Sequence, residues 1–295
     1  MLLRHIRYFL AVAERKNFTR AAEALHVSQP TLSQQIRQLE DTLGTQLFDR
    51  SGKAVQLTDA GEAWARYAKL ALQDLDAGVR AIHDVAELSR GSLRLAVTPT
   101  YTAYLVGPIV NGFHKLHPGI KIDIRELTQD QMEAQLIDDK LDLGVAFHPA
   151  FSADIESHPL FEETLSLVIG RGHPRATHRK AISVSDFGQE ALVLLNDTFA
   201  TRRFIDDHFV RHSIRPLVAV EVDSIAAIVE IVRHGQLATV LPDHITRVHE
   251  DLQPVPLDPP LPKRTAAVLE RKGAYRTAAS RAFSQLLAER YGKSK

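Results

Sequence analysis

The stretch 19–50 constrains this chain most, because it holds two short helical patterns joined by a tight turn. The first pattern covers residues 19–25 and contains three alanines, whose small side chains let another helix cross close to the backbone. The turn is His26-Val27. Ser28 then stands where a helix N-cap belongs, and Pro30 falls in the first turn, where its missing N–H costs nothing. The stretch therefore predicts helix, turn and second helix.

The second helix is predicted to bury one face and expose the other. Apolar residues recur at spacings of four, three and four, which form one helical stripe: Leu32, Ile36, Leu39 and Leu43. The opposite face carries amides, hydroxyls and one guanidinium: Gln29, Thr31, Ser33, Gln34, Arg37 and Gln38. Such groups suit the hydrogen-bonding edges of base pairs in a major groove. The pattern predicts a helix-turn-helix with a DNA-reading helix, although an ordinary helical hairpin with a polar outer face fits it too.

A wing is expected behind this helix. Residues 47–50 and 55–58 have strand character and flank the glycine-containing turn Ser51-Gly52-Lys53. Arg50 and Lys53 lie near the expected tip, where they would face phosphates. The residues expected to contact DNA are Thr19, Ser28, Gln29, Pro30, Thr31, Ser33, Gln34, Arg37, Gln38, Arg50 and Lys53.

The set AAxxLxVSQPxLSxQIxxLE…LGxxLFxR…LTxAG resembles the LysR-type transcriptional regulators. This resemblance implies an α/β multidomain protein with three parts. A winged helix-turn-helix occupies residues 1–58, and a linker helix that dimerises occupies 59–90. A two-lobed effector domain, similar to periplasmic binding proteins, occupies 91–295. The resemblance also implies a homotetramer, built as a dimer of dimers whose effector domains touch.

Length and composition predict a cytoplasmic protein with several domains. A chain of 295 residues suggests two or three domains. It has no cysteine, so it has no disulfide framework and no thiolate zinc site. No apolar run is long enough to cross a bilayer. Charge returns at Glu14, Arg15 and Lys16 without a cleavage site, so the N-terminus is interpreted as an amphipathic first helix and not as a signal peptide.

Charge is unevenly distributed although the chain is neutral as a whole. Residues 1–58 hold eight Lys and Arg against five Asp and Glu. This basic excess is modest for a DNA-binding region. We therefore expect affinity for DNA to come from several such regions acting together.

Residues 59–90 predict a long helix with an oligomerisation seam. Thr58 is suited to cap it, and no proline occurs from residue 58 to residue 98. Apolar residues follow a heptad spacing of four and three: Ala68, Leu72, Leu75, Val79, Ile82 and Ala86. Such a seam predicts pairing with a second copy of the helix. Packing of the stripe on the first helix of the same chain is the alternative.

From residue 92 strand and helix patterns alternate, which predicts an α/β region with mostly parallel sheets. Strands are expected at 93–97, 120–124, 141–147, 165–169, 192–195, 218–222, 238–241 and 265–269. Helices are expected at 101–116, 132–137, 201–212, 225–234 and 277–289. By resemblance, the lobes are 92–163 plus 266–295 and 164–265, with a cleft between them.

Polar residues at the strand ends are the candidate ligand groups. Hydroxyls and unpaired N–H groups at helix starts can hold an anion, and several such ends meet at one crevice. The expected effector-binding set is Thr98, Thr100, Tyr101, Thr102, Thr128, Phe147, Thr201 and Ser224. A capping role explains Thr100 equally well. Arg202 is expected in solvent or against a carboxylate, and His148 is expected to be a loop residue.

The chain shows no signature of catalysis, so no catalytic residue, metal or cofactor is expected. It contains no HExxH, GxSxG, P-loop or GxGxxG motif. Hydroxymethylbilane synthase shares the two-lobed fold but anchors its cofactor on a cysteine, which this chain lacks. A solute-binding protein is the other alternative, and the DNA-reading pattern argues against it.

Within the family, the phrases RAIHDVAELSRGSLRLAVTPTYT, LVLLNDTFATR and SIAAIVEIVR resemble activators of cyanate operons. This resemblance implies a small anion such as cyanate as the effector. It also implies an inverted-repeat promoter site on double-stranded DNA, and RNA polymerase as a partner if the protein activates transcription. A regulator of another metabolic operon with a different effector is the alternative.

Overall fold

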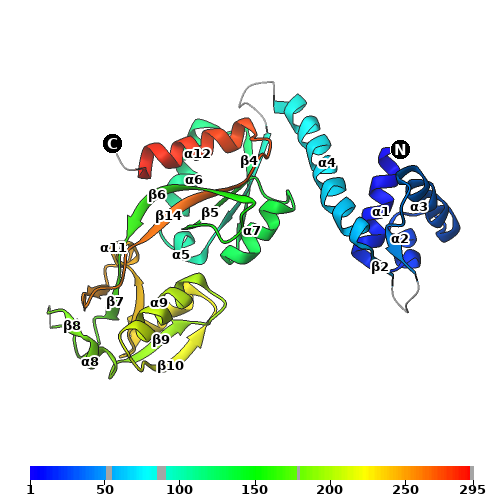
Figure 1. Cartoon of the computed structure of the whole chain (residues 1–295). Helices are drawn as coiled ribbons and strands as arrows, with labels where there is room; N and C mark the ends of the chain where they lie inside the picture. The colour runs from blue at the N-terminus through cyan, green and yellow to red at the C-terminus, as the bar shows by residue number, and fades with distance from the viewer. Residues whose placement is uncertain (51–54, 85–90, 178–179, 293–295) are drawn as a thin grey trace. The chain divides into compact units, whose positions relative to one another are not determined.

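The computed structural model describes residues 1–50, 55–84, 91–177 and 180–292 (Figure 1). The chain divides into two compact units, Met1–Ile82 and His83–Lys295. The division falls near the end of one long helix, so most of the predicted linker belongs with the first unit. Lys53 of the expected wing and Ala86 of the expected seam lie outside the described residues.

The first unit is a winged helix-turn-helix followed by the long helix. Its elements are α1 (Leu3–Arg15), α2 (Phe18–Ala24), α3 (Gln29–Leu43), β1 (Phe48–Asp49), β2 (Gln56–Leu57) and α4 (Asp59–Asp84). The two short strands pair antiparallel. Ser28 caps α3 as predicted, because the Thr31 N–H donates to its Oγ at 3.3 Å.

Three helices and the wing share one apolar core, centred on Phe9, Ile36 and Phe48. Close packing fixes the start of α4 against this core. A Cβ on Gly61 would lie 2.0 Å from the carbonyl oxygen of Leu47, so only glycine fits there. The sequence thus ties the beginning of the long helix to the wing.

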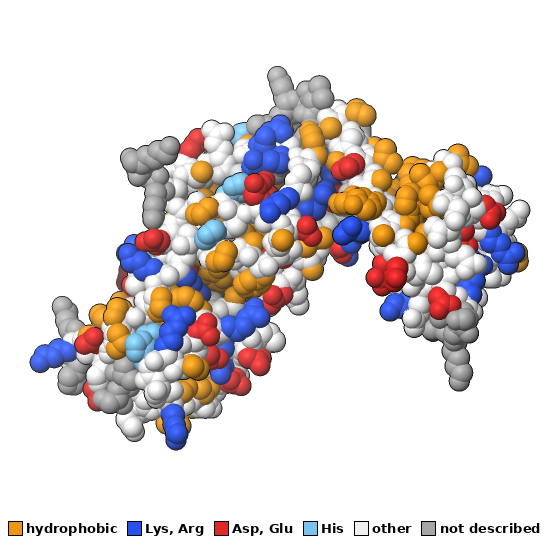
Figure 2. Space-filling view, in the orientation of Figure 1, with side chains coloured by type: hydrophobic (Ala, Val, Ile, Leu, Met, Phe, Trp, Pro, Cys, Tyr) orange, Lys and Arg blue, Asp and Glu red, His pale blue; other side chains and the backbone are white. Residues whose placement is uncertain are grey.

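The apolar stripe of α4 divides into two halves. Ala68 is buried in the core of its own unit. Leu75, Val79 and Ile82 are 52%, 56% and 74% exposed. Apolar side chains are visible on the surface where α4 lies (Figure 2). The first half of the stripe therefore packs on its own chain. The second half is exposed to solvent in the single chain.

Lobe I of the second unit is a five-stranded sheet in the order β4-β3-β5-β14-β6. These strands are β3 (Gly91–Val97), β4 (Ile120–Glu126), β5 (Leu143–His148), β6 (Ile155–Glu163) and β14 (Arg264–Arg271). Helices α6 (Val106–Leu116) and α12 (Ala278–Tyr291) pack in one core, and α7 (Gln129–Ile137) packs in another. The two cores cover the two faces of the sheet (Figure 1).

Lobe II contains a three-stranded sheet, β11-β7-β12, and a parallel pair, β10-β9. A bridge between Leu192 and Ala238 links the two. The strands are β7 (Leu165–Gly170), β9 (Ala191–Leu195), β10 (Leu217–Val222), β11 (Thr239–Pro242) and β12 (Leu252–Val255). The helices are α9 (Ala200–Arg211), α10 (Ile225–His234) and α11 (Asp243–Val248). A short pair, β8 (Ile182–Ser183) and β13 (Leu257–Asp258), lies beside α8 (Val184–Phe187).

The chain passes between the lobes twice. It leaves lobe I where β6 runs into β7 at Thr164, and it returns where β14 begins at Arg264. Arg264 pairs in register with Glu163, so the two connections lie side by side. Residues at this junction therefore belong to both lobes.

Two expectations about this unit were wrong. The sheets are not mostly parallel, because β14, β11 and β12 all pair antiparallel with their neighbours. The helix expected at 101–116 is broken into α5 (Pro99–Thr102) and α6. Pro108 explains the break, since it cannot donate to the carbonyl of residue 104 and must lie in the first turn of a new helix.

Strand β6 was not anticipated at all. Its sequence IESHPLFEE lacks regular alternation and contains a proline, which is tolerated because β6 is the last strand of its sheet. Within the described residues, no helix has both the length and the apolar character needed to cross a membrane.

Candidate DNA-binding face and effector site

The outer face of α3 is polar and accessible. Leu32, Ile36 and Leu39 are fully buried on its inner side. The residues expected to read DNA are on the other side, where Gln29, Thr31, Gln34, Arg37 and Gln38 are exposed and Ser33 is half-buried. Within the described part of the chain, Gln34 and Arg37 have no intramolecular polar partner. Their hydrogen-bonding groups are thus available to another molecule.

The beginning of α3 is fixed more tightly. Ser28 Oγ lies 2.7 Å from Thr31 Oγ1, and Gln29 Nε2 donates to Ser33 Oγ at 2.9 Å. Pro30 occupies the first turn, and Thr19 is exposed on α2. These contacts hold the first turn of α3 in place. The side chains of Gln34 and Arg37, further along the helix, have no such contacts among the described residues.

Arg50 does not extend freely from the wing. Its Nη2 donates to Glu40 Oε2 at 2.9 Å, and its guanidinium lies 5.4 Å from the ring of Phe18. Glu40 also accepts the N–H groups of Leu47 and Phe48. The arginine expected to face phosphates is therefore occupied by a carboxylate of its own unit.

The residues expected to bind the effector do not surround one space. Thr100 and Thr201 instead meet directly, with 3.0 Å between their hydroxyl oxygens, and both are buried. Arg264 Nη1 donates to the same Thr201 oxygen at 2.9 Å. Thr100 is thus neither a helix cap nor an open anion site in this structure, because it connects the two lobes.

Tyr101 was expected to line the crevice, but its ring lies in the core of lobe I. Its hydroxyl donates to Glu163, and Tyr104 donates to the other oxygen of that carboxylate at 2.8 Å. Arg264 Nε also binds Glu163, which is 1% exposed. Burial and the nearby carboxylate raise the pKa of both tyrosines, so they remain donors. A buried polar network therefore occupies the junction between the lobes.

Residues of the predicted effector set line three hollows between the lobes. The Phe147 hollow, of about 620 Å³, is lined by Gln129, Asp130, Phe147, His148, Pro149, Phe151, Ala200, Arg203, Phe204, Asp207, Lys263, Arg264 and Thr265. The Thr128 hollow, of about 350 Å³, is lined by Pro99, Glu126, Leu127, Thr128, Gln131, Asn196, Thr198, Phe199 and Asp223. The Ser224 hollow, of about 320 Å³, contains Thr102 and Ser224. The predicted residues are thus divided among separate spaces.

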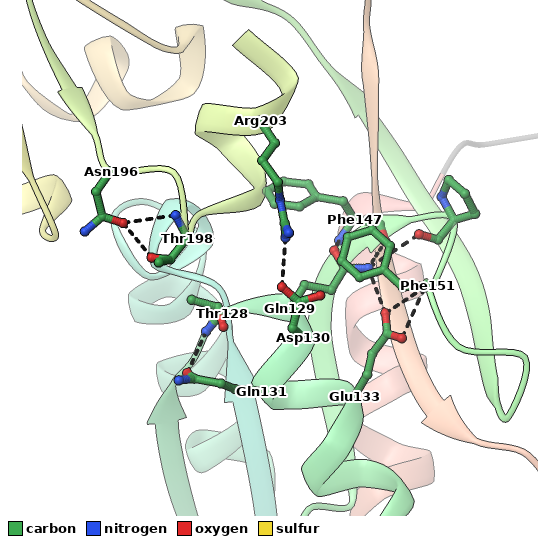
Figure 3. A network of polar contacts seen from close by, with 11 residues as sticks. Thr128, Gln129, Asp130, Gln131, Glu133, Phe147, Phe151, Asn196, Thr198 and Arg203 are labelled. Atoms are coloured by element: carbon green, nitrogen blue, oxygen red, sulfur yellow. Dashed lines mark hydrogen bonds and ion pairs between the residues drawn. The ribbon is translucent and has the colours of Figure 1, made fainter. Parts of the chain in front are cut away.

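The Phe147 hollow lies between α7 of lobe I and α9 of lobe II (Figure 3). Arg203 on α9 forms an ion pair with Asp130 on α7 at 2.9 Å and so joins the lobes. Gln129 is buried and exchanges hydrogen bonds with the backbone of Phe147. This glutamine fixes the end of β5, and with it the aromatic wall of the hollow.

The Thr128 hollow is mostly polar. Asn196 Oδ1 accepts both the N–H and the hydroxyl of Thr198, and the Thr128 N–H donates to Gln131 (Figure 3). Thr98, also in the predicted set, is buried, and its hydroxyl oxygen has no partner among the described residues. Ser224 caps α10, so its side chain already accepts the N–H of Ala227.

Four residues of the junction were not anticipated: Gln129, Glu163, Arg203 and Arg264. Their contacts join distant parts of the chain, for example Arg264 and Glu163, which are 101 positions apart. Strand and helix periodicity carries no signal for such pairs. Arg202, which was expected in solvent or against a carboxylate, is mostly buried and binds Asp206 and Glu221.

Comparison with known proteins agrees with this architecture. A family model for the LysR substrate binding domain matches residues 86–292, and one for the bacterial regulatory helix-turn-helix protein of the lysR family matches residues 3–62. The hydrogen peroxide-inducible genes activator of Dickeya chrysanthemi is 31% identical over 277 residues, covering 93% of this chain and 90% of that protein.

Solved structures show the same fold over nearly the whole chain. A full-length OxyR of Pseudomonas aeruginosa, substituted at one cysteine, aligns with a TM-score of 0.69 and 28% identity, covering 98% of this chain and 95% of the other. Full-length CbnR in complex with its target DNA aligns with a TM-score of 0.61 and 22% identity, covering 98% and 99%. Matching proteins such as these are regulators of transcription and not enzymes.

A DNA-reading helix followed by a two-lobed domain defines a transcriptional regulator with an effector-binding domain. The chain belongs to the LysR family of bacterial transcriptional regulators.

Proposed function

We propose that this protein binds an inverted-repeat promoter site as a dimer or tetramer and changes transcription when a small anion binds between its lobes. The outward polar face of α3, opposite a fully buried apolar stripe, carries this proposal. Gln34 and Arg37 supply the donors and acceptors that base edges require. The names of relatives, several of which are activators, support activation and hence contact with RNA polymerase.

Gel-shift titration tests the reading helix. Arg37→Ala and Gln34→Ala should each reduce discrimination between the promoter and a scrambled duplex by about 1–3 kcal/mol. Arg211→Ala removes an exposed arginine from the second unit and serves as the matched control. Unchanged discrimination in both α3 variants would refute the assignment of α3 as the reading helix.

Dimerisation through α4 is the second part of the proposal. Leu75, Val79 and Ile82 keep a heptad spacing and are exposed, so a second copy of α4 would remove them from water. A two-fold dimer carries two α3 helices, which matches a palindromic site. The exposed half of the stripe supports the proposal that α4 pairs with a second copy.

Sedimentation of the full-length chain tests this surface. The double variant Leu75→Asp and Ile82→Asp should sediment as a smaller species than wild type, because pairing of α4 would bury unpaired charges. Val210→Asp, at a valine that is 79% exposed on α9, is the control and should sediment as wild type. A double variant with the wild-type mass would show that α4 is not the interface.

The effector is proposed to bind in the hollows between the lobes. Thr128 and Phe147 face two of these hollows, and Thr102 and Ser224 face the third. Thr100, Tyr101 and Thr201 lie in the buried network at the junction and would respond to a change in the position of the lobes, and Thr98 is buried just before them in the chain. A ligand shifts that position only by binding one arrangement more tightly than the other.

The composition of the chain excludes one kind of effector sensing. The 295 residues include no cysteine, so oxidation of a thiol by peroxide is not how this protein senses its effector. The resemblance to activators of cyanate operons makes cyanate the first ligand to test. Calorimetric titration of the full-length protein with cyanate decides this point, and absence of heat would reject cyanate and leave the family assignment intact.

A further inference from the structure

The Phe147 hollow is large and aromatic for a site that would take a three-atom anion. Its volume of about 620 Å³ falls in the range of sites for small organic molecules. Phe147, Phe151 and Phe204 contribute three aromatic side chains to its lining. Cyanate would leave most of this surface uncovered.

Phe151 gives the hollow an accessible aromatic side chain, whose ring centre lies 5.6 Å from the guanidinium carbon of Arg203. Phe151 is 57% exposed as a residue, although two hydrogen bonds hold its backbone N–H. The N–H groups of Phe151 and Ser152 both donate to the buried carboxylate of Glu133, at 2.8–3.1 Å, and Figure 3 shows the bonds from Phe151. Exposing an apolar ring at a fixed position is unfavourable in water, and a flat apolar ligand would remove that cost.

Cations stand beside these rings. Arg203 and Lys263 are exposed at the rim, and Arg264 lies deeper, with its guanidinium carbon 4.2 Å from the centre of the Phe147 ring. Arg264 is 6% exposed, and its Nη2 has no hydrogen-bond partner among the described residues. A buried donor without an acceptor is unfavourable, so an acceptor that reached it would be bound favourably.

The cations of the hollow already have carboxylate partners. Arg203 pairs with Asp130, Lys263 Nζ lies 3.4 Å from Glu162, and Arg264 Nε binds Glu163. The pair of Arg203 with Asp130 is about half exposed on each side, and such pairs contribute little stability. A ligand carboxylate can therefore replace Asp130 on Arg203 at small cost.

We infer that the Phe147 hollow binds a small aromatic carboxylate. Its ring lies against Phe147, Phe151 and Phe204, and its carboxylate binds Arg203 at the rim and Arg264 after a small movement of the lobes. This inference rests on the proposed function, because it specifies the effector class of that interlobe site.

The same arrangement connects the ligand to the lobes. Arg264 Nη1 binds Thr201, whose hydroxyl meets Thr100 of lobe I. A ligand that repositions Arg264 changes this contact, and a ligand that takes Arg203 from Asp130 removes a second link between the lobes.

Calorimetry on the full-length protein tests the inference. Benzoate, phenylacetate and cinnamate are the probes, and their amides are neutral controls of the same shape. At least one carboxylate should bind with an affinity roughly tenfold or more above that of its amide, as expected for loss of a charged hydrogen-bond partner. If no carboxylate binds more tightly than its amide, the inference is overturned.

Two variants at exposed positions locate the site without disturbing the core. Arg203→Gln should weaken the carboxylate about tenfold and leave the amide unchanged, and Phe151→Ala should weaken both. Arg211→Gln, on the same helix but outside the hollow, should match wild type. Equal effects of Arg203→Gln and Arg211→Gln would place the ligand elsewhere and overturn the inference.

The titrations also separate this inference from the proposed function. Binding of cyanate that is weakened by Thr100→Val, with no binding of the aromatic acids, would overturn the aromatic class and keep the interlobe effector site. Absence of binding by every probe, with operator binding intact, would overturn the aromatic class together with the small-anion proposal, and only the DNA-binding part would stand.

Discussion

The polar residues of α3 and those between the lobes satisfy opposite conditions. Gln34 and Arg37 are exposed and, among the described residues, bind nothing in their own unit. Thr100, Thr201 and Glu163 are buried and bind one another or a common arginine. The first set gains its partners only from another molecule, whereas the second set already has partners that a ligand must compete with or displace. A substitution in the polar face of α3 should therefore affect DNA recognition. A substitution in the network between the lobes should affect the stability of the fold.

The largest effect is expected at Glu163. Glu163→Gln leaves the guanidinium of Arg264 buried without a counter-charge, which should lower the free energy of unfolding by about 3–5 kcal/mol. Glu162→Gln, at the exposed neighbour that pairs loosely with Lys263, should change it by less than about 0.5 kcal/mol. Urea denaturation followed by circular dichroism measures both. A loss below about 1 kcal/mol for Glu163→Gln would show that the junction is not a buried ionic network.

A moderate effect is expected at Thr100. Thr100→Val preserves volume and removes the hydroxyl that meets Thr201, so unfolding should become easier by about 1 kcal/mol. Thr201→Val alone and both changes together complete a double-mutant cycle. Because the two hydroxyls bind each other, the double variant should lose less than the sum of the single losses. Strict additivity would mean that the contact between the lobes contributes nothing measurable.

The smallest effect concerns pH. His208 is buried, its Nδ1 has no hydrogen-bond partner among the described residues, and burial lowers its pKa, with His212 and Arg211 acting in the same direction. Below about pH 6.5 the unfolded chain therefore binds more protons than the folded chain at this residue. Stability from His208 is complete above about pH 6.5 and declines as the pH falls below that value.

Denaturation midpoints measured from mildly alkaline to mildly acidic pH check the sign. His208→Gln should flatten the decline, and His114→Gln, at an exposed histidine of lobe I, should leave it as in wild type. A His208→Gln variant whose stability declines as steeply as that of wild type below about pH 6.5 would contradict a lowered pKa at His208.

The two regions also differ in how far sequence predicts them. The turn, the Ser28 cap and the stripe of α3 are local features, so residue spacing predicts them correctly. The break before α6 was missed although Pro108 signals it, and β6 was missed because its sequence is irregular. Between the lobes, spacing identified Thr100 and Thr201 but not their contact. That contact depends on packing of residues 101 positions apart, which no local pattern encodes.

The bond between Glu40 and Arg50 has a consequence for ionic strength. An arginine without a partner displaces counterions when it meets a phosphate, and this release makes DNA binding weaken as salt is added. Arg50 is already paired with the carboxylate of Glu40, at 2.9 Å, before it meets DNA. Contact with a phosphate would exchange one anion for another at Arg50. The wing should therefore help to place the protein on DNA while adding less than one full charge to the salt dependence of binding.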